Sequence, residues 1–415
     1  MAGLMQPLAA GAQLVAYHRR LRSSHDFDVF VDVLDLNEKV IGSAIMLDGQ
    51  VNITDDGLVR RTASLSLSDP EGAFDFTGAA AWNGTSLWVD TLARVRHVTN
   101  VPGYGEMTAV PFIGPPTSLS RSGGEVKVEL KDKAALAMRG ARPLTVHKGM
   151  KATDAIQKVM SYCTGEFRFR VPSLSRRLSR HYSVGLADDA APMVVAARIA
   201  QAELGMQLLY SCDGYLTLRP RPSQPVAHMG DVTDLASSSA DFSTVVNYVK
   251  VTGKAVSKKK GNKTTTTQAI STAQTKPSSE VSPERIARQG VPRLLPLVIT
   301  DDGYTTTAQT ARRASAELAG GAGVVAQPSV AVVPMFHLDA DDIVTVTGDQ
   351  GDTITVRLST ASIPLGVGGD MAIGFRRWVS SKALGKPRSH YTRSVKIAKH
   401  KKSAKTSKAT KGAHK

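Results

Sequence analysis

The chain has 415 residues, 42% of them hydrophobic and 21% charged, which is enough apolar material for roughly two to four domains with real cores. The formal net charge is +16, but residues 371 to 415 hold 14 Lys and Arg and no acidic residue, which leaves +2 for residues 1 to 370. A nearly neutral body argues against a protein that binds nucleic acid over its whole surface. There is no run of ~18 apolar residues, so we expect no membrane span. The first charged side chains, Arg19 and Arg20, follow the apolar start instead of preceding it, so a secretory signal is not expected.

The first part of the chain is predicted to consist of short β-strands. Aromatic residues make up only 5% of the sequence, which favours a β-rich protein with many turns over a helical bundle. Residues 26 to 36 alternate polar and apolar side chains, the period of a half-buried strand. Turn signals separate the further strands predicted at 40–47, 50–54, 58–68, 87–98 and 125–130. We expect an N-terminal arm over 1–25 and a β-barrel or sandwich domain over 26–145.

A smaller α+β domain is predicted over residues 146–235. Apolar side chains at helical spacing indicate a helix from Ala152 to Cys163, which Gly165 ends. The stretch from Arg168 to His181 mixes basic and aromatic residues, as a nucleic-acid-binding stripe would. A strand followed by a solvated loop is the favoured interpretation, because the rest of the body has no matching basic face.

The segment that follows predicts a helix and a hairpin. Asp188-Asp189 are N-cap candidates, Pro192 suits the first turn, and Gly205 is the expected left-handed C-cap. Two short runs within 207–219 flank Asp213-Gly214, a pair that suits a type I′ turn. This segment has the features of an assembly module and not of an active site.

A second β-rich domain is predicted over 236–375. It holds a flexible insertion over 254–290, because the Lys-, Thr- and Ser-rich stretch there offers little to bury. A helix is expected from Thr306 to Ala319, ended by Gly320-Gly321. The strands expected in this domain are 245–252, 324–333, 343–348 and 353–358. The fold class is therefore mainly β with α+β insertions: β-barrel or sandwich tube-type domains plus a smaller helix-and-hairpin domain.

Residues 376–415 are predicted to form a basic, disordered C-terminal tail. Such a tail suits a polyanion such as nucleic acid or an anionic cell-wall polymer, and it also suits a solvated tail that only aids solubility. The candidate polyanion-binding residues are Lys396, Lys399, Lys401, Lys402, Lys405, Lys408, Lys411 and Lys415.

No set of residues predicts catalysis. The sequence lacks a nucleophile elbow, a P-loop, an HExxH zinc motif and paired CxxC motifs, so we expect no catalytic, cofactor-binding or metal-binding residues and no enzyme. Asp339, Asp341 and Asp342 suggest calcium by density, but their spacing is not that of an EF-hand and a turn is favoured. Cys163 and Cys212 are expected to be small buried hydrophobes, and a disulfide between them stays an open alternative.

Several segments resemble minor tail proteins of tailed bacteriophages that infect actinobacteria. They are "DVFVDVLDLNEKV", "LDGQVNITDDGLVRRTASLSLSDPEG" and "VPFIGPPTSLSRSGGEVKVELKDKAALAM". The order of the later elements is similar to that of phage baseplate hub (tail-tip hub) proteins, on "KATDAIQKVMSYCTG", "AARIAQAELGMQLLYSCDGYLTLRPRP", "VVNYVKVTG" and "AQTARRASAELAGGAG". Together the resemblance spans Asp28 to Leu358 and leaves the Lys/Thr-rich insertion and the basic tail outside the family pattern.

The resemblance implies a structural virion protein of the tail tip, made in the host cytoplasm. It implies β-barrel tube domains that assemble as a homotrimeric ring and link the tail tube to the distal tip or receptor-binding proteins, with a part in attachment and genome delivery. Its partners would be the distal tail ring, the tape measure and tip or fibre proteins. Two alternatives stay open: a tail-associated cell-wall-degrading enzyme, and a nucleic-acid-binding protein that acts through its basic tail.

Overall fold

The computed structural model describes residues 3–4, 12–21, 26–70, 87, 89–139, 142–232, 238–241, 243–323, 325–328, 331–332, 334–348, 353–366, 369–377 and 384–397. These residues form a mainly β protein with a few helices, which confirms the predicted fold class. In this part of the chain, no helix has both the length and the apolar character needed to cross a membrane.

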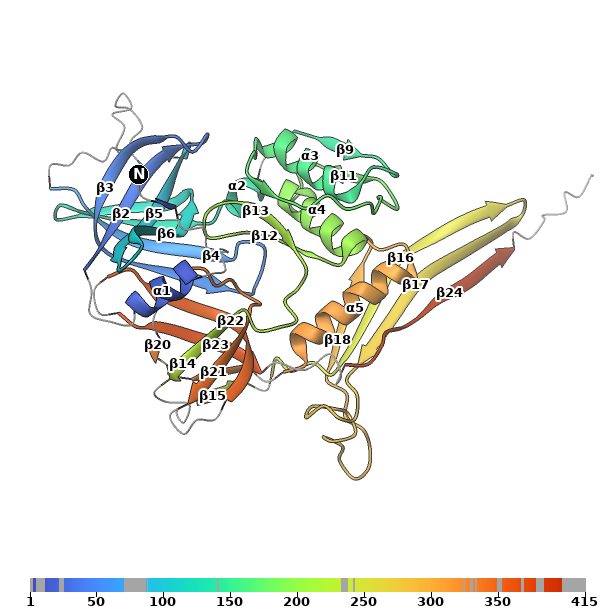
Figure 1. Ribbon diagram of the computed structural model, residues 1–415. Coiled ribbons are helices and arrows are strands. Elements are labelled where there is room, and N and C mark those ends of the chain that lie inside the picture. The colour runs from blue at the N-terminus through green and yellow to red at the C-terminus, as the bar shows by residue number, and fades with distance from the viewer. Residues whose placement is uncertain are drawn as a thin grey trace, which may run out of the picture.

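Fifteen of the described strands form one strongly curved sheet, called here the large sheet, on the left of Figure 1. Its N-terminal strands are β1 (Gly3–Leu4), β2 (Phe27–Asp35), β3 (Val40–Thr54), β4 (Arg61–Ser68), β5 (Thr91–Val101), β6 (Gly105–Gly114), β7 (Pro116–Ser122) and β8 (Glu125–Lys131). Its C-terminal strands are β14 (Ala227–Val232), β15 (Ser238–Asp241), β19 (Val325–Pro328), β20 (Ala331–Val332), β21 (Ile343–Gly348), β22 (Thr353–Pro364) and β23 (Met371–Arg377). The N-terminal and C-terminal strands of the sheet meet where β3 and β22 pair antiparallel, with Val51 opposite Ile363. Strands from the two predicted β-rich regions, 26–145 and 236–375, therefore share one sheet.

The concave side of the large sheet encloses the main hydrophobic core. Strand β4 buries every second side chain, Leu65 among them, and its partner β8 does the same with Val128. Leu358 of β22 and Phe375 of β23 belong to the same buried cluster. Each such side chain contributes about 1.5–3 kcal/mol on burial, so the two ends of the chain stabilise each other.

A short helix lies in the region predicted as an N-terminal arm. Helix α1 (Ala12–Leu21) places Tyr17 against the large sheet, where only 1% of the residue is exposed. The Tyr17 hydroxyl forms a hydrogen bond of 2.9 Å with Nδ1 of His97 on β5. Part of the arm is therefore packed on the sheet.

The helix-hairpin module, residues 142–219, lies to the right of the upper part of the large sheet in Figure 1 and has its own core. Its elements are β9 (Leu144–Val146), α3 (Ala152–Thr164), β10 (Phe169–Arg170), β11 (Tyr182–Val184), the 3₁₀ turn η1 (Asp188–Ala190), α4 (Pro192–Ile199), the π-helical turn η2 (Ala200–Leu204), β12 (Gln207–Tyr210) and β13 (Leu216–Arg219). The small helix α2 (Ala134–Ala137) contributes to the same core. Helix α3 ends at Gly165 in the left-handed conformation, as predicted.

The predicted helix after Asp188 is confirmed with two corrections. Asp188-Asp189 form a separate 3₁₀ turn, and the N-cap residue of α4 is Ala191, which makes no side-chain cap. Pro192 occupies the first turn as expected, and Gly205 ends the helical stretch with φ 69°. Between them the helix widens into the π-helical turn η2, which the apolar spacing did not reveal.

The predicted hairpin is confirmed, but its turn is not type I′. Strands β12 and β13 pair antiparallel, with Tyr210 opposite Leu216. Only Gly214 has a positive φ, at 79°, whereas type I′ needs a positive φ at Asp213 as well. A Cβ atom on Gly214 would lie 2.5 Å from Ile113, so this position also requires glycine for lack of space.

A second sheet projects to the right in Figure 1, with strand order β18 (Pro296–Asp301), β16 (Tyr248–Lys260), β17 (Lys263–Gln274) and β24 (Arg388–Ile397). Helix α5 (Thr307–Gly321) packs on its base and begins with a capping box between Thr306 and Gln309. The helix runs through the glycines predicted to stop it, and its C-cap is Ala322.

Two sequence predictions are corrected by this sheet. Residues 254–260 and 263–274 of the predicted flexible insertion belong to β16 and β17, which pair along most of their length. A composition poor in apolar residues hid them, although the β-branched threonines at 264–267 suit a strand. Residues 388–397 of the predicted disordered tail form β24, which pairs with β17 through ten consecutive residues.

Candidate functional site

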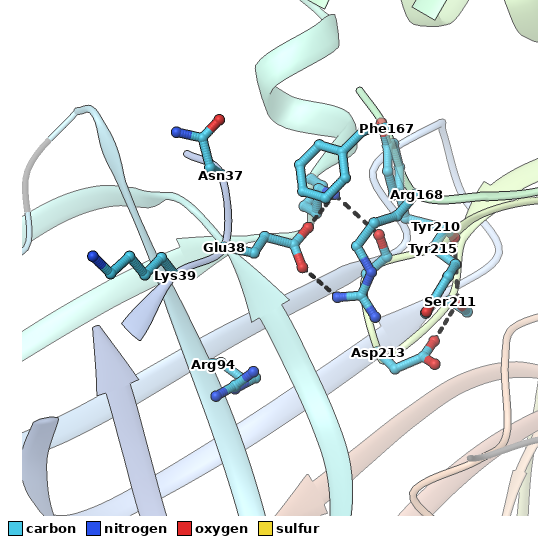
Figure 2. A network of polar contacts seen from close by, with 12 residues as sticks. Asn37, Glu38, Lys39, Arg94, Phe167, Arg168, Tyr210, Ser211, Asp213 and Tyr215 are labelled. Carbon is cyan, nitrogen blue, oxygen red and sulfur yellow. Dashed lines mark hydrogen bonds and ion pairs between the residues drawn. The ribbon is translucent and has the colours of Figure 1, made fainter. Parts of the chain in front are cut away.

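The helix-hairpin module meets the large sheet through buried ion pairs of Lys133 and Glu38, and Figure 2 shows the network around Glu38. Lys133 follows β8, and its side chain is only 5% exposed. Its Nζ lies 2.6 Å from Oε1 of Glu38 and 2.8 Å from Oε2 of Glu166, and it also donates to the Gly214 carbonyl at 3.1 Å. A single ammonium therefore joins the β2–β3 turn of the sheet to two loops of the module.

The second oxygen of Glu38 accepts from Arg168 of the module, and Figure 2 shows the carboxylate pointing at that guanidinium. Glu38 has a left-handed backbone, with φ 61°, in the turn between β2 and β3. The Asp35 side chain holds this turn by accepting from the backbone N–H groups of Asn37 and Lys39 at 2.9 Å. The turn thus aims Glu38 away from its own sheet and into the module.

Glu166 is saturated by donors. Besides Lys133, it accepts from the Tyr210 hydroxyl at 2.9 Å and from the backbone N–H groups of Phe167 and Arg168 at 2.9 and 2.8 Å. Burial and the neighbouring Glu166 carboxylate raise the pKa of Tyr210 well above its ordinary value, so this phenol stays a donor. The carboxylate has no room for a further partner and serves as a fixed anchor.

The two arginines of the predicted basic stretch that flank Phe169 point inward. The guanidinium carbons of Arg168 and Arg170 lie 3.9 and 4.0 Å from the centre of the Tyr215 ring. Arg170 also pairs with Asp213 at 2.6 Å. The Asp-Gly turn of the hairpin is therefore part of the polar network. The sequence predicted only that these two residues form a turn.

A second network surrounds the aspartates predicted to form a turn. Asp339, Asp341 and Asp342 do lie in the turn before β21, and they pair with arginines from three regions of the chain. The arginines are Arg60 and Arg61 from the start of β4, Arg219 and Arg221 from the end of the hairpin, and Arg357 of β22. Among the described residues, no group of three or more His, Cys, Asp or Glu is arranged to hold a metal ion.

Arg61 is the most deeply buried member of this network, with a side chain 1% exposed. Its guanidinium donates to Asp339 at 2.8 Å, to the Pro111 carbonyl at 3.2 Å and to the Leu338 carbonyl. One side chain thus joins β4, β6 and the loop before β21.

Asp341 is held ionised by the same arginines. Burial alone would raise its pKa, but Arg221, Arg60 and Arg357 outweigh burial and hold the pKa below its ordinary value. A carboxylate with a lowered pKa in the folded state stabilises the fold at neutral pH, and this stabilisation is lost as the solution is acidified below the ordinary value of 3.8.

A third polar contact connects α5 to the helix-hairpin module. The Glu203 carboxylate in η2 accepts from the Tyr182 hydroxyl at 2.8 Å and from the Gln309 side chain at 3.2 Å. A cavity of about 690 Å³ lies where the large sheet, the module and α5 meet, lined by Arg60, Gln207 and Arg313 among others. Five of its charged lining residues form ion pairs with one another: Arg60 and Arg221 contact Asp341, and Arg313 contacts Glu317.

The residues predicted as a polyanion site are placed only in part. Lys396 is exposed on β24, and the other seven lysines of that set lie outside the described residues. Cys163 and Cys212 are both free thiols, so the alternative of a disulfide is wrong. Cys212 is buried as expected, whereas Cys163, which was also expected to be buried, is only half-buried.

The fold is similar to that of two tail proteins. The 43 kDa tail protein of prophage MuSo2 from Shewanella oneidensis matches with TM-score 0.51 and 12% identity, over 86% of this chain and 100% of that one. The tail protein from Neisseria meningitidis MC58 matches with TM-score 0.51 and 13% identity, over 85% of this chain and 97% of that one. No protein-family model and no curated protein matches the sequence. At these identities the likeness establishes a shared fold across nearly the whole chain.

Proposed function

We propose that the chain is a structural protein of a phage tail tip, a hub or minor tail protein that works in the virion of a phage infecting actinobacteria. The observation that carries this proposal is the fold, which two tail proteins share over at least 85% of this chain. The polar contacts around Lys133, Asp341 and Glu203 support it, because they hold three parts of the chain in fixed positions. Fixed geometry is what a connector between other proteins needs.

We propose further that the chain assembles as a homotrimeric ring that links the tail tube to the distal tip or receptor-binding proteins. The neighbours would be the distal tail ring, the tape measure and tip or fibre proteins. Support comes from an exposed apolar strip on β2 and β3, formed by Phe30, Ile45 and Leu47, which are 42%, 72% and 57% exposed. Phe30 and Ile45 are directly paired across the strands, and Leu47 lies two residues farther along β3. An apolar patch of this kind marks a contact with another protein.

The carboxylates of the described networks give no support to an enzyme. Glu38, Glu166 and Asp341 are each held by cationic partners at the contacts between modules. A general acid or base needs a free edge toward a substrate. We therefore propose a non-enzymatic role, and a lysis band in zymography on host cell wall would contradict it.

Light scattering of the purified protein tests the ring. We expect a mass near three copies of the 44.1 kDa chain, about 132 kDa. The double variant Ile45→Asp/Leu47→Asp should run as a monomer, because two carboxylates on the apolar strip oppose burial at an interface. Leu186→Asp is the matched control, since Leu186 is 80% exposed on the helix-hairpin module, away from the strip. A wild-type protein that stays monomeric at every concentration would contradict self-assembly.

A further inference from the structure

The second sheet ends in a projection that no other part of the described chain covers. Helix α5 packs on the base of this sheet, and the tips of β16, β17 and β24 extend beyond it to the far right of Figure 1. We call this projection, residues 254–268 and 392–397, the basic wing. Its two segments lie far apart in the sequence and become neighbours through the pairing of β24 with β17.

The basic wing carries only positive charge. Its cations are Lys254, Lys258, Lys259, Lys260, Lys263, Arg393 and Lys396, and all seven are exposed. Neither segment contains an acidic residue. None of the seven forms an ion pair with another described residue, whereas most arginines of the body that were described above do.

The pairing register places these cations on both faces of the sheet in the basic wing. Lys259 aligns with Thr264 and Thr264 with Lys396, so these three side chains share one face. Lys258 and Lys260 are the immediate neighbours of Lys259 in β16. They project from the other face, because successive side chains of a strand alternate between the two faces. Side chains of like charge this close repel one another, and that cost is offset when an anion binds.

The chemistry of the basic wing favours the phosphates of a nucleic acid over a protein partner. Protein interfaces are depleted in Lys and depend on buried aromatic or apolar anchors. The wing has no aromatic residue, and its described side chains include no exposed large apolar one. Lysine ammonium groups and hydroxyls such as those of Thr264 and Thr265 are instead the kind of donor that contacts phosphate oxygens.

The absence of aromatic side chains in the wing also bears on the kind of nucleic acid. Proteins that bind single strands stack bases on aromatic rings, whereas a duplex presents its phosphates outward and needs no stacking. We propose that the basic wing binds the phosphate backbone of double-stranded DNA without reading its base sequence. DNA binding by the wing does not depend on ring formation through the β2–β3 strip. An experiment that contradicts one of these two proposals therefore leaves the other intact.

Seven further lysines follow the wing in the sequence, between residues 398 and 415. The binding experiment therefore has to separate the wing from the tail. The wing variant replaces Lys258, Lys259, Lys260 and Lys263 with Gln. The tail variant replaces Lys399, Lys401, Lys402, Lys405, Lys408, Lys411 and Lys415 with Gln. The matched control replaces four exposed lysines of the body, Lys127, Lys131, Lys148 and Lys158, with Gln.

Fluorescence anisotropy with a labelled DNA duplex measures the affinity of each full-length variant. With about six phosphate contacts, the association constant of the wild type should fall roughly 10³-fold between 50 and 200 mM salt. The wing variant should bind at least about tenfold more weakly at low salt, and its salt slope should be smaller by about 3 to 4, at 0.9 per lost contact. The control variant should match the wild type.

Three outcomes would overturn the proposal. The first is a wild type that does not bind the duplex at low salt. The second is a wing variant with wild-type affinity and slope while the tail variant loses binding, which would assign the DNA contact to the tail. The third is a wing variant that still binds DNA normally but loses binding to vesicles of anionic phospholipid, which would make the wing a membrane contact. Far-UV circular dichroism of each variant checks that the sheet is intact.

Discussion

Lys133→Met is expected to lower the free energy of unfolding by about 3–5 kcal/mol, as measured by urea denaturation. The substitution leaves Glu166 buried without the ammonium that lies 2.8 Å away, and it leaves Glu38 with Arg168 alone. Methionine fills the space of the apolar part of the lysine side chain. The loss of unfolding free energy therefore measures the missing charge and not a cavity. Because the ammonium joins the large sheet to the helix-hairpin module, we expect a protease to cleave the variant first in the chain segments that connect these two parts.

A control and a rescue make this prediction specific. Lys158→Met, on the exposed face of α3, should change the stability by less than about 0.5 kcal/mol. Lys133→Met/Glu166→Gln should regain part of the loss, because the second change removes the uncompensated negative charge. If Lys133→Met were as stable as the wild type, the buried ion pairs would not be what holds the module in place.

Arg61→Met is the second substitution with a large expected effect, again a loss of about 3–5 kcal/mol in the free energy of unfolding. Without the guanidinium, the carbonyls of Pro111 and Leu338 lose a buried donor, and Asp339 keeps only Arg219 at 3.8 Å. Unfolding followed by both fluorescence and circular dichroism should show the two ends of the large sheet losing stability together.

Two further variants show which property of Arg61 matters. Arg61→Lys keeps the charge but loses the planar fork that reaches three acceptors, so we expect a smaller loss of about 1–3 kcal/mol. Arg176→Met, at an exposed position, should be nearly neutral. An Arg61→Lys variant with wild-type stability would mean that the charge alone is needed and the hydrogen bonds to the carbonyls are not.

Local patterns in the sequence were sufficient to predict most individual elements. The alternation in residues 26 to 36 became β2, the apolar spacing before Gly165 became α3, and the runs around Gly214 became a hairpin. These predictions succeeded because each depends on neighbours within a few residues. Composition was a poorer guide: the Lys- and Thr-rich stretch was predicted to be flexible, yet its residues 254–260 and 263–274 form part of two long strands.

The polar networks could not be predicted, because their members are far apart in the sequence. Lys133 contacts Glu38, which is 95 residues away, and Arg61 contacts Asp339, which is 278 residues away. No spacing rule connects such residues. The density of Asp339, Asp341 and Asp342 was the one visible signal, and it pointed correctly to a turn but not to the five arginines around it.

The pairing of β3 with β22 was hidden for the same reason. Each strand shows an ordinary strand pattern, and nothing in either predicts a partner some 300 residues away. Only the structure shows this pairing, and the fold in which it lies is shared with two tail proteins over at least 85% of this chain.

We propose that the chain is a structural protein of a phage tail, and its location in the particle tests this proposal most directly. Virions of the phage whose genome encodes the chain would be purified, and an antibody against the folded protein would be imaged with gold in the electron microscope. We predict gold at the end of the tail opposite the capsid, and peptides of the chain in the mass spectrum of the same particles. A protein made during infection but missing from purified virions would contradict the account.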